Sequence, residues 1–214
     1  MTAIGRRLRR IVDVVAERTD EGRRVAQLEP IRSRRVGDDA ATIGVLTYRG
    51  VSSSEIDEPV RMLADRMRAN VVFVGASVGL VHAVEPSRRI SVSHTPSDAP
   101  RIDVLVVPGG LGWRQVIDDP EIRRWLAATA ASARGILAIS TGSLLLASVG
   151  RLDGREATGH WLAESELAAL GATVTSTRTA SDDAGRVVTA SGALAAIEVV
   201  EDLADRTQWA QWMP

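Results

Sequence analysis

Residues 135–147, GILAISTGSLLLA, pass from a buried strand pattern into a helix pattern without an intervening loop. Ser140 stands at the junction, and the small residues Ala138 and Gly142 lie two positions before and after it. A nucleophile elbow needs this spacing, because its tight strand-to-helix turn leaves no room for larger neighbours. Such a turn projects the serine side chain and directs the next N–H, that of Thr141, toward a developing anion. A serine that caps the helix N-terminus is the alternative.

On both sides of this stretch the chain alternates between short apolar runs and longer amphipathic segments, which is typical of an α/β domain with a mostly parallel sheet. The sequence predicts strands at 42–48, 71–77, 103–108, 135–140, 173–178 and 186–190. It predicts helices at 55–69, 118–132, 141–149, 160–170 and 192–206. The runs at 80–85 and 89–95 flank a Pro-Ser turn and predict a hairpin at the sheet edge.

The composition excludes several kinds of chemistry. All 26 basic residues are arginine, so a Schiff base on this chain, including one with pyridoxal phosphate, is excluded. The absence of cysteine removes disulfides, thiolate metal sites and thiol nucleophiles. Three scattered histidines do not form a metal motif, and PGGLG lacks the lysine of a phosphate loop. We therefore expect no metal and no cofactor.

The two ends of the chain differ from its middle. Residues 1–41 contain an arginine-rich amphipathic helix pattern followed by a linker, and we interpret them as an extension that packs on its own domain or on a second subunit. The main domain is predicted to span 42–207. The tail at 208–214 carries two tryptophans, and we expect it to dock on its own or a partner subunit. Without a signal core or membrane span, the predicted location is cytoplasmic.

Ligands of open α/β sheets bind at the carboxyl ends of the strands, so residues just after each strand are the first candidates. Glu55 follows the first strand, within SSSE, which also resembles a helix capping box around an exposed acid. Gly109 and Gly110 follow the third strand and can supply N–H donors close to a ligand. Ser140 follows the fourth strand, and His160 lies further downstream in ATGHW.

Three motifs together, DVLVVPGGLGWRQ, AISTGSLLLASVGRLDGREATGHW and TRTASDDAGRVVTASGALAAIEVV, resemble the ThiJ/PfpI family of the class I glutamine amidotransferase-like superfamily. The resemblance covers roughly residues 42–206 and points to the branch with isonitrile hydratases and AraC-type regulator sensor domains. It implies a flavodoxin-like three-layer sandwich that forms a homodimer. It also implies a cysteine at the elbow and an acid after the first strand. In this chain those positions hold Ser140 and Glu55, with Pro59 in place of the later proline of the motif.

Serine at the elbow changes the chemical requirement, since a hydroxyl needs a general base during attack whereas a cysteine ionises near neutral pH. Glu55 or His160 would be that base. His160 and Trp161 match a histidine-tryptophan pair of the family, and three roles remain open for them: helix start, pocket wall, or acid and base. Arg114 and Arg178, also at motif positions, either hold an anionic ligand or form structural ion pairs.

The sequence thus supports two functions. The first is a hydratase- or hydrolase-like enzyme in which Ser140 attacks or positions water, Glu55 moves the proton, and the Thr141, Gly110 and Gly109 N–H groups hold the oxyanion. The second is a non-catalytic ligand-binding or dimerisation module, or a variant silenced by serine in place of cysteine. The chain stops soon after the last predicted helix, so we expect no helix-turn-helix and no direct nucleic-acid binding. This favours a free-standing enzyme that acts on a small molecule.

Overall fold

A computed structural model describes residues 30–182, 184–203 and 212 of the chain. Among these residues the main sheet has the strand order β2-β1-β5-β6-β10-β9, and its strands are parallel except that β9 runs antiparallel to β10. The strands are β1 (Thr42–Leu46), β2 (Asn70–Val74), β5 (Val104–Val107), β6 (Gly135–Ile139), β9 (Thr179–Ser181) and β10 (Val187–Ala190). This mostly parallel α/β sheet confirms the fold class expected from the alternating pattern.

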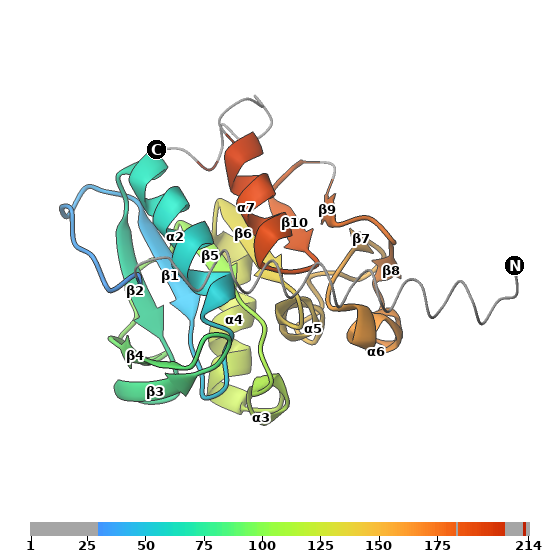
Figure 1. Cartoon of the computed structure of the whole chain (residues 1–214), viewed down its shortest axis with the longest axis horizontal. Helices are drawn as coiled ribbons and strands as arrows, with labels where there is room; N and C mark the ends of the chain where they lie inside the picture. Colours follow the sequence, from blue (N-terminus) through green and yellow to red (C-terminus); the bar gives the residue numbers. More distant parts are fainter. Residues whose placement is uncertain (1–29, 183, 204–211, 213–214) are drawn as a thin grey trace, which may run out of the picture.

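Helices cover both faces of the sheet. Figure 1 shows α2 (Ser54–Met67) and α7 (Ala193–Asp202) on the near face and α4 (Pro120–Ser132) on the far face. The central strands β1, β5, β6 and β10 are buried along their whole length, which is why their sequences are continuous apolar runs and do not alternate. Asp119 caps α4 by accepting hydrogen bonds from the N–H groups of Glu121 and Ile122 at 2.9 and 3.1 Å.

The predicted hairpin forms, as β3 (Gly79–Ala83) paired antiparallel with β4 (Arg88–Val92). It is a two-stranded sheet of its own and not an edge of the main sheet, to which it is joined by isolated bridges such as Val74–His94. In Figure 1 it lies near the carboxyl ends of β1 and β2. The hairpin therefore helps to hold the segment that follows β1.

The short elements after β5 differ most from the sequence prediction. They are α3 (Trp113–Val116), α5 (Gly142–Ala147), β7 (Glu156–Ala157), the 3₁₀ turn η1 (Trp161–Ala163), α6 (Glu164–Ala169) and β8 (Thr173–Val174). The predicted strand at 173–178 is thus only two residues long and pairs with β7, outside the main sheet. The predicted helix at 160–170 is divided into η1 and α6. Elements this short carry too few residues for a periodic pattern.

Parts of both predicted ends pack on the domain. Arg34, in the predicted linker, exchanges backbone hydrogen bonds with Val71 on the outer strand β2 at 3.0 and 2.8 Å. Trp212 is buried against this same chain, where its ring fills the space over Gly135, and its Nε1–H donates to the Gly185 carbonyl at 3.0 Å. The amphipathic helix predicted near the N-terminus and the other tryptophan of the tail, Trp209, lie outside the described residues.

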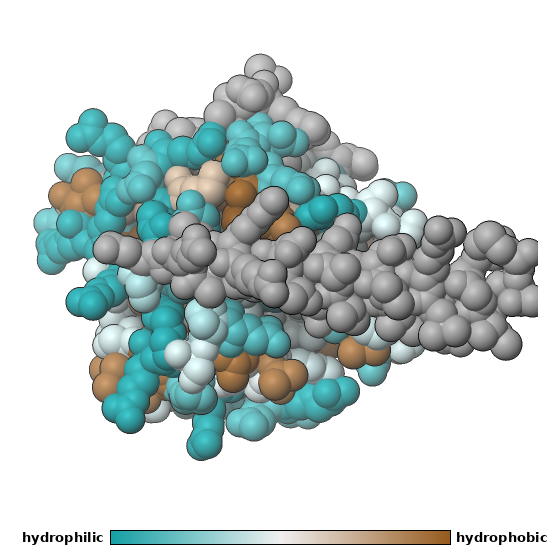
Figure 2. All heavy atoms as spheres, in the orientation of Figure 1, coloured by the Kyte–Doolittle hydropathy of each residue, from teal (hydrophilic) through white to brown (hydrophobic). Residues whose placement is uncertain are grey.

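The visible described surface is mostly hydrophilic in the view of Figure 2, with apolar residues in small separate groups. The exposed large apolar residues of the described chain are Val36, Val78, Leu80, Leu111, Trp161 and Leu162. No helix within the described ranges is long and apolar enough to cross a membrane.

Candidate active site

Ser140 sits in a strained turn between β6 and α5. Its backbone is left-handed, with φ 57°, a conformation that costs a residue with a side chain about 1–2 kcal/mol. Its N–H donates to the Ala190 carbonyl at 2.7 Å and so continues the pairing of β6 with β10. The N-cap of α5 is Thr141, so the helix-cap interpretation of Ser140 is wrong. Strain of this kind is concentrated at functional turns.

Crowding of the backbone around this turn explains the small residues near it. A Cβ at Gly142 would lie 1.9 Å from the Val107 carbonyl oxygen, on the neighbouring strand β5. A Cβ at Gly159 would lie 2.9 Å from the Ser140 carbonyl oxygen. Both distances are shorter than real carbon contacts, so both positions require glycine. The backbone at Gly159, next to His160, is therefore in close contact with Ser140.

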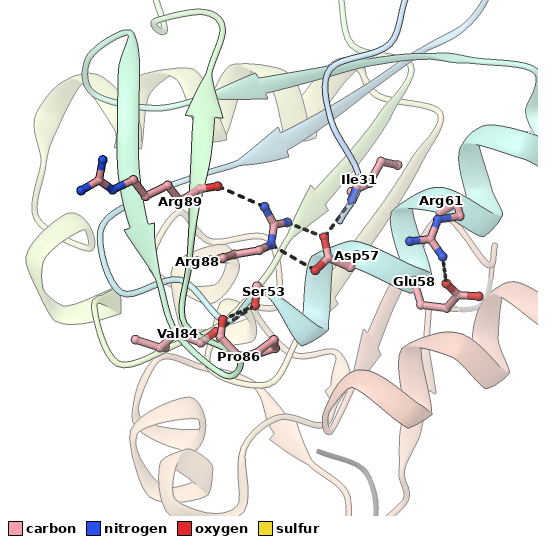
Figure 3. Close-up of polar contacts among 9 residues, drawn as sticks. All are labelled: Ile31, Ser53, Asp57, Glu58, Arg61, Val84, Pro86, Arg88 and Arg89. Carbon is pink, nitrogen blue, oxygen red and sulfur yellow. Dashed lines mark hydrogen bonds and ion pairs between the residues drawn. The ribbon is translucent and has the colours of Figure 1, made fainter. Parts of the chain in front are cut away.

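Glu55 is buried, with 7% of its surface exposed, and enters the site from the first turn of α2. Its Oε2 accepts a hydrogen bond from the Gly109 N–H at 2.6 Å. The capping-box alternative is wrong here, because Ser53 makes no side-chain cap. Figure 3 shows that the Ser53 hydroxyl instead reaches the Val84 and Pro86 carbonyls, at 3.2 and 2.6 Å. Glu55 is thus a buried carboxyl that is held in place at the sheet edge.

Glu55 and the residue after Ser140 meet at Gly109. The point where a Gly109 Cβ would stand lies 3.0 Å from Glu55 Oε2, 2.7 Å from the Thr141 nitrogen and 2.6 Å from Thr141 Oγ1. Three segments far apart in the sequence, following β1, β5 and β6, therefore converge on one small region. A side chain at position 109 would fill it.

The N–H groups of this region are used differently from the expected oxyanion set. The Gly109 N–H donates to Glu55, and the Gly110 N–H donates to Thr141 Oγ1 at 3.0 Å. Among the described residues, the Thr141 N–H donates to no protein group. Of the three predicted donors, Thr141 is therefore the one whose N–H is not bonded to another described residue.

Tyr48, which the sequence analysis did not single out, borders the same region. It is buried at the end of the β1 segment, and its hydroxyl donates to the Pro108 carbonyl at 3.0 Å. Burial raises the pKa of Tyr48 well above 10.0, and the nearby Glu55 carboxylate adds to the rise. The hydroxyl therefore stays protonated and remains a donor. The signal available in the sequence was that Tyr48, the only tyrosine of the chain, ends the first predicted strand.

His160 caps η1, because its Nδ1 accepts a hydrogen bond from the Leu162 N–H at 3.2 Å. Its ring stacks on Trp161, with 6.0 Å between ring centroids. This geometry matches the helix-start role, and it leaves the pocket-wall and acid–base roles as predictions. Trp161 is 38% exposed, so one part of its ring remains accessible to a ligand or a partner.

The two arginines at motif positions each contact a side chain outside the set of candidate site residues. The Arg114 guanidinium lies over the Trp113 ring, 4.5 Å from its centroid, on α3. Arg178 forms an ion pair with Glu198 of α7 at 3.3 Å. The ion pair matches the structural alternative for Arg178, and the ligand-binding alternatives for both arginines stay predictions.

Asp57, two residues after Glu55, faces a different environment. Figure 3 shows that Arg88 of the hairpin binds both of its carboxylate oxygens and that the Ile31 N–H donates to one of them. Burial raises the pKa of Asp57, while Arg88 and the Ile31 N–H oppose that rise. Asp57 thus joins α2 to the hairpin, and Glu55 alone of the two acids contacts Gly109.

No group of three metal-ligating side chains occurs within the part of the chain that the structure describes. The polar groups that converge here are the Thr141 hydroxyl, the Glu55 carboxylate and backbone N–H groups. This set is suited to proton transfer and to the stabilisation of negative charge.

The chain is similar to several known proteins. A family model described as the DJ-1/PfpI family matches residues 41–206. An isonitrile hydratase from Pseudomonas putida is 31% identical over 165 residues, which make up 77% of this chain and 71% of the relative.

Solved structures show the same fold. A ThiJ/PfpI family protein from Pseudomonas syringae superimposes with a TM-score of 0.71 at 26% identity, covering 86% of this chain and 79% of that protein. DJ-1 from Schizosaccharomyces pombe superimposes with a TM-score of 0.65 at 16% identity, covering 80% of this chain and 96% of that protein. The second likeness concerns the fold alone.

Proposed function

We propose that this chain, which belongs to the DJ-1/PfpI family, is an enzyme of the hydratase or hydrolase type. Its substrate is a small molecule. One observation carries the proposal. Thr141, the residue after the strained Ser140, and the buried Glu55 carboxyl lie together around Gly109, and no described protein group accepts a hydrogen bond from the Thr141 N–H. A helix cap or a surface acid would need neither the strain nor the burial.

Each group has a role that its position supports. The Ser140 hydroxyl attacks the substrate carbon, because the sharp turn presents its side chain to the site. Glu55 accepts the hydroxyl proton during attack and later returns it, as a buried carboxyl within reach of the elbow segment can. The Thr141 N–H stabilises negative charge on the oxygen bonded to the reacting carbon, which for an isonitrile is the oxygen that water adds. His160 and Trp161 form the side of the site next to Gly159.

Isonitriles are the substrate class we favour, because a relative at 31% identity is an isonitrile hydratase. Glu55 passes the Ser140 proton to the terminal carbon of R–NC while the serine oxygen bonds to that carbon, which gives a serine-bound imidate, R–N=CH–O–Ser. Water then adds to this carbon, with its proton moving to nitrogen. The carbon–serine bond breaks, the proton returns to the serine, and the formamide R–NH–CHO leaves. The sum is hydration of the isonitrile.

A ligand-binding module without catalysis is the second candidate, and one observation favours it. Two of the three expected N–H donors are bonded to Glu55 and Thr141 side chains, and the elbow carries a hydroxyl where the resemblance implies a thiol. Turnover that appears only in Ser140→Cys would support this candidate. Turnover by the unmodified chain would exclude it.

The experiment that tests the enzyme proposal compares acid variants against isonitriles, α-oxoaldehydes and small amides. Glu55→Gln removes the proton carrier and keeps the shape, so turnover should fall by about 100-fold or more. Asp57→Asn is the matched control, because its carboxyl is also buried on α2 but bonds to Arg88. Equal loss in both variants, with intact circular dichroism, would contradict a specific role for Glu55.

The partners follow from the same proposal. We infer a small-molecule ligand, a second copy of the chain as the usual partner, and a cytoplasmic location, all supported by membership of the family. The exposed Leu111, Trp161 and Leu162 side chains near the site are suited to an interface or to an apolar substrate group. Sedimentation of the purified chain would show whether it forms a dimer.

A further inference from the structure

The peptide group between Pro108 and Gly109 is held at both edges by one segment of the chain. The Tyr48 hydroxyl donates to the Pro108 carbonyl at 3.0 Å, and the Gly109 N–H donates to Glu55 Oε2 at 2.6 Å. In a trans peptide the C=O and the N–H point in opposite directions. Tyr48 and Glu55 therefore form hydrogen bonds with opposite sides of the same planar peptide group.

Further backbone contacts join the same two segments. The Gly109 carbonyl accepts a hydrogen bond from the Ser52 N–H at 2.8 Å, and the Gly112 N–H donates to the Gly50 carbonyl at 3.2 Å. A Cβ at Gly110 would lie 2.3 Å from the Gly50 carbonyl oxygen, so the two backbones are in direct contact. Three successive polar groups, the Pro108 carbonyl and both backbone groups of Gly109, are thus bonded to residues 48–55.

Tyr48 is the member of this set whose side chain binds a backbone carbonyl, that of Pro108. It is 5% exposed, and its Cδ2 lies 3.2 Å from the Cβ position of Gly112, so the ring packs against the loop that it binds. A hydrogen bond accepted at a carbonyl polarises the amide and strengthens the N–H of the same peptide as a donor. The Tyr48 hydroxyl thereby strengthens the bond from Gly109 to Glu55.

We propose that Tyr48 is a positioning residue, which fixes the Glu55 carboxylate by locking the orientation of the Pro108–Gly109 peptide. The lock keeps the Gly109 N–H directed at Glu55, so Gly109 binds the carboxylate, and the Thr141 N–H is left for the oxygen that forms on the reacting carbon. The lock is a property of the structure, but its effect on catalysis rests on the proposed role of Glu55.

The test compares Tyr48→Phe with Thr47→Val. Thr47 is the matched control: it is adjacent, 1% exposed, and its hydroxyl also donates to a backbone carbonyl at 3.0 Å, that of Val45. Amide hydrogen exchange measured by NMR should be at least about tenfold faster at Gly109 in Tyr48→Phe, because opening of that one bond becomes easier. Exchange at Gly109 in Thr47→Val, relative to that at Val106 in β5, should be unchanged.

Two results would overturn the proposal. One is an unchanged rate at Gly109 in Tyr48→Phe, and the other is an equal acceleration at Gly109 and Val106, which would show only a general loss of stability. Activity separates this proposal from the proposed function. If Glu55 acts as proposed, Tyr48→Phe lowers kcat by about tenfold and leaves KM unchanged. If Glu55→Gln retains full turnover, the enzyme proposal fails even where the exchange at Gly109 still responds to Tyr48→Phe.

Discussion

Glu55 and Gly109 are 54 positions apart in the sequence, and the carboxylate of the first accepts a hydrogen bond from the backbone N–H of the second at 2.6 Å. This contact joins the first turn of α2 to the loop after β5, beside the turn that carries Ser140. A buried carboxylate is stable only with hydrogen-bonding partners, and a backbone donor supplies one without adding a charge. The contact therefore fixes a buried carboxylate close to the turn that contains Ser140 and Thr141.

The strained backbone of Ser140 predicts a difference between two variants that both lack the hydroxyl. Ser140→Gly relieves the left-handed conformation, whereas Ser140→Ala keeps it. We expect the free energy of unfolding to be about 1 kcal/mol greater for Ser140→Gly than for Ser140→Ala. Denaturant titration of the two proteins measures this difference. Equal stabilities would show that the turn is unstrained.

The single tyrosine gives a clean prediction at high pH. Because the pKa of Tyr48 in the folded chain is raised well above 10.0, the folded state holds its proton when the unfolded state has lost it. This stabilising contribution is complete below pH 10 and is lost as the pH rises further. Ultraviolet absorbance of tyrosinate should therefore appear only together with unfolding followed by circular dichroism. Tyrosinate that appears near pH 10 in the folded protein would contradict the burial of Tyr48.

Because Gly142 lies close to β5, adding one methyl group at this position should strongly destabilise the fold. A Cβ there would lie 1.9 Å from the Val107 carbonyl oxygen, so Gly142→Ala should lower the free energy of unfolding by about 2–3 kcal/mol. Gly37→Ala is the control, because no atom lies within 4 Å of its Cβ position, and it should change stability by less than about 0.5 kcal/mol. Similar melting curves for both variants would argue against the tight turn.

The buried ring of Trp212 predicts that the end of the chain stabilises the domain. The side chain is 1% exposed and fills the space above Gly135, so Trp212→Ala should cost about 3–5 kcal/mol through the cavity it leaves. Trp161→Ala, at a position 38% exposed, should cost much less in the same urea titration. A smaller loss for Trp212→Ala than for Trp161→Ala would show that the ring does not pack in solution.

The elements that depend on local pattern could be predicted from the sequence. The continuous apolar runs of β1, β5 and β6 identified a buried parallel sheet, and the small residues around Ser140 identified a tight turn. The motifs also led to the family, which the family model and the relatives show. Glu55 was selected by resemblance, and the sequence alone could not separate it from an exposed acid in the first turn of a helix.

The contacts across the site could not be predicted, since they depend on backbone directions set by tertiary packing. The sequence around Gly109 and Gly110 gives no indication that their N–H groups bond to side chains rather than face a ligand. Likewise nothing local to Tyr48 shows that its hydroxyl reaches a carbonyl 60 positions away. The same holds for Trp212, whose partner Gly135 is distant in the chain.

The most direct test of the proposed serine chemistry is the rate at which three proteins release formamide from an isonitrile. The three proteins are the unmodified chain, Ser140→Ala and Ser143→Ala. Ser143 is the matched control: it is also a buried serine beside the elbow, but its hydroxyl donates to the Thr158 carbonyl at 2.8 Å. If Ser140 acts as proposed, the unmodified chain turns over the isonitrile, Ser140→Ala loses about 1,000-fold or more of that turnover, and Ser143→Ala stays near normal. Turnover by Ser140→Ala at the rate of the unmodified chain would contradict that role of Ser140.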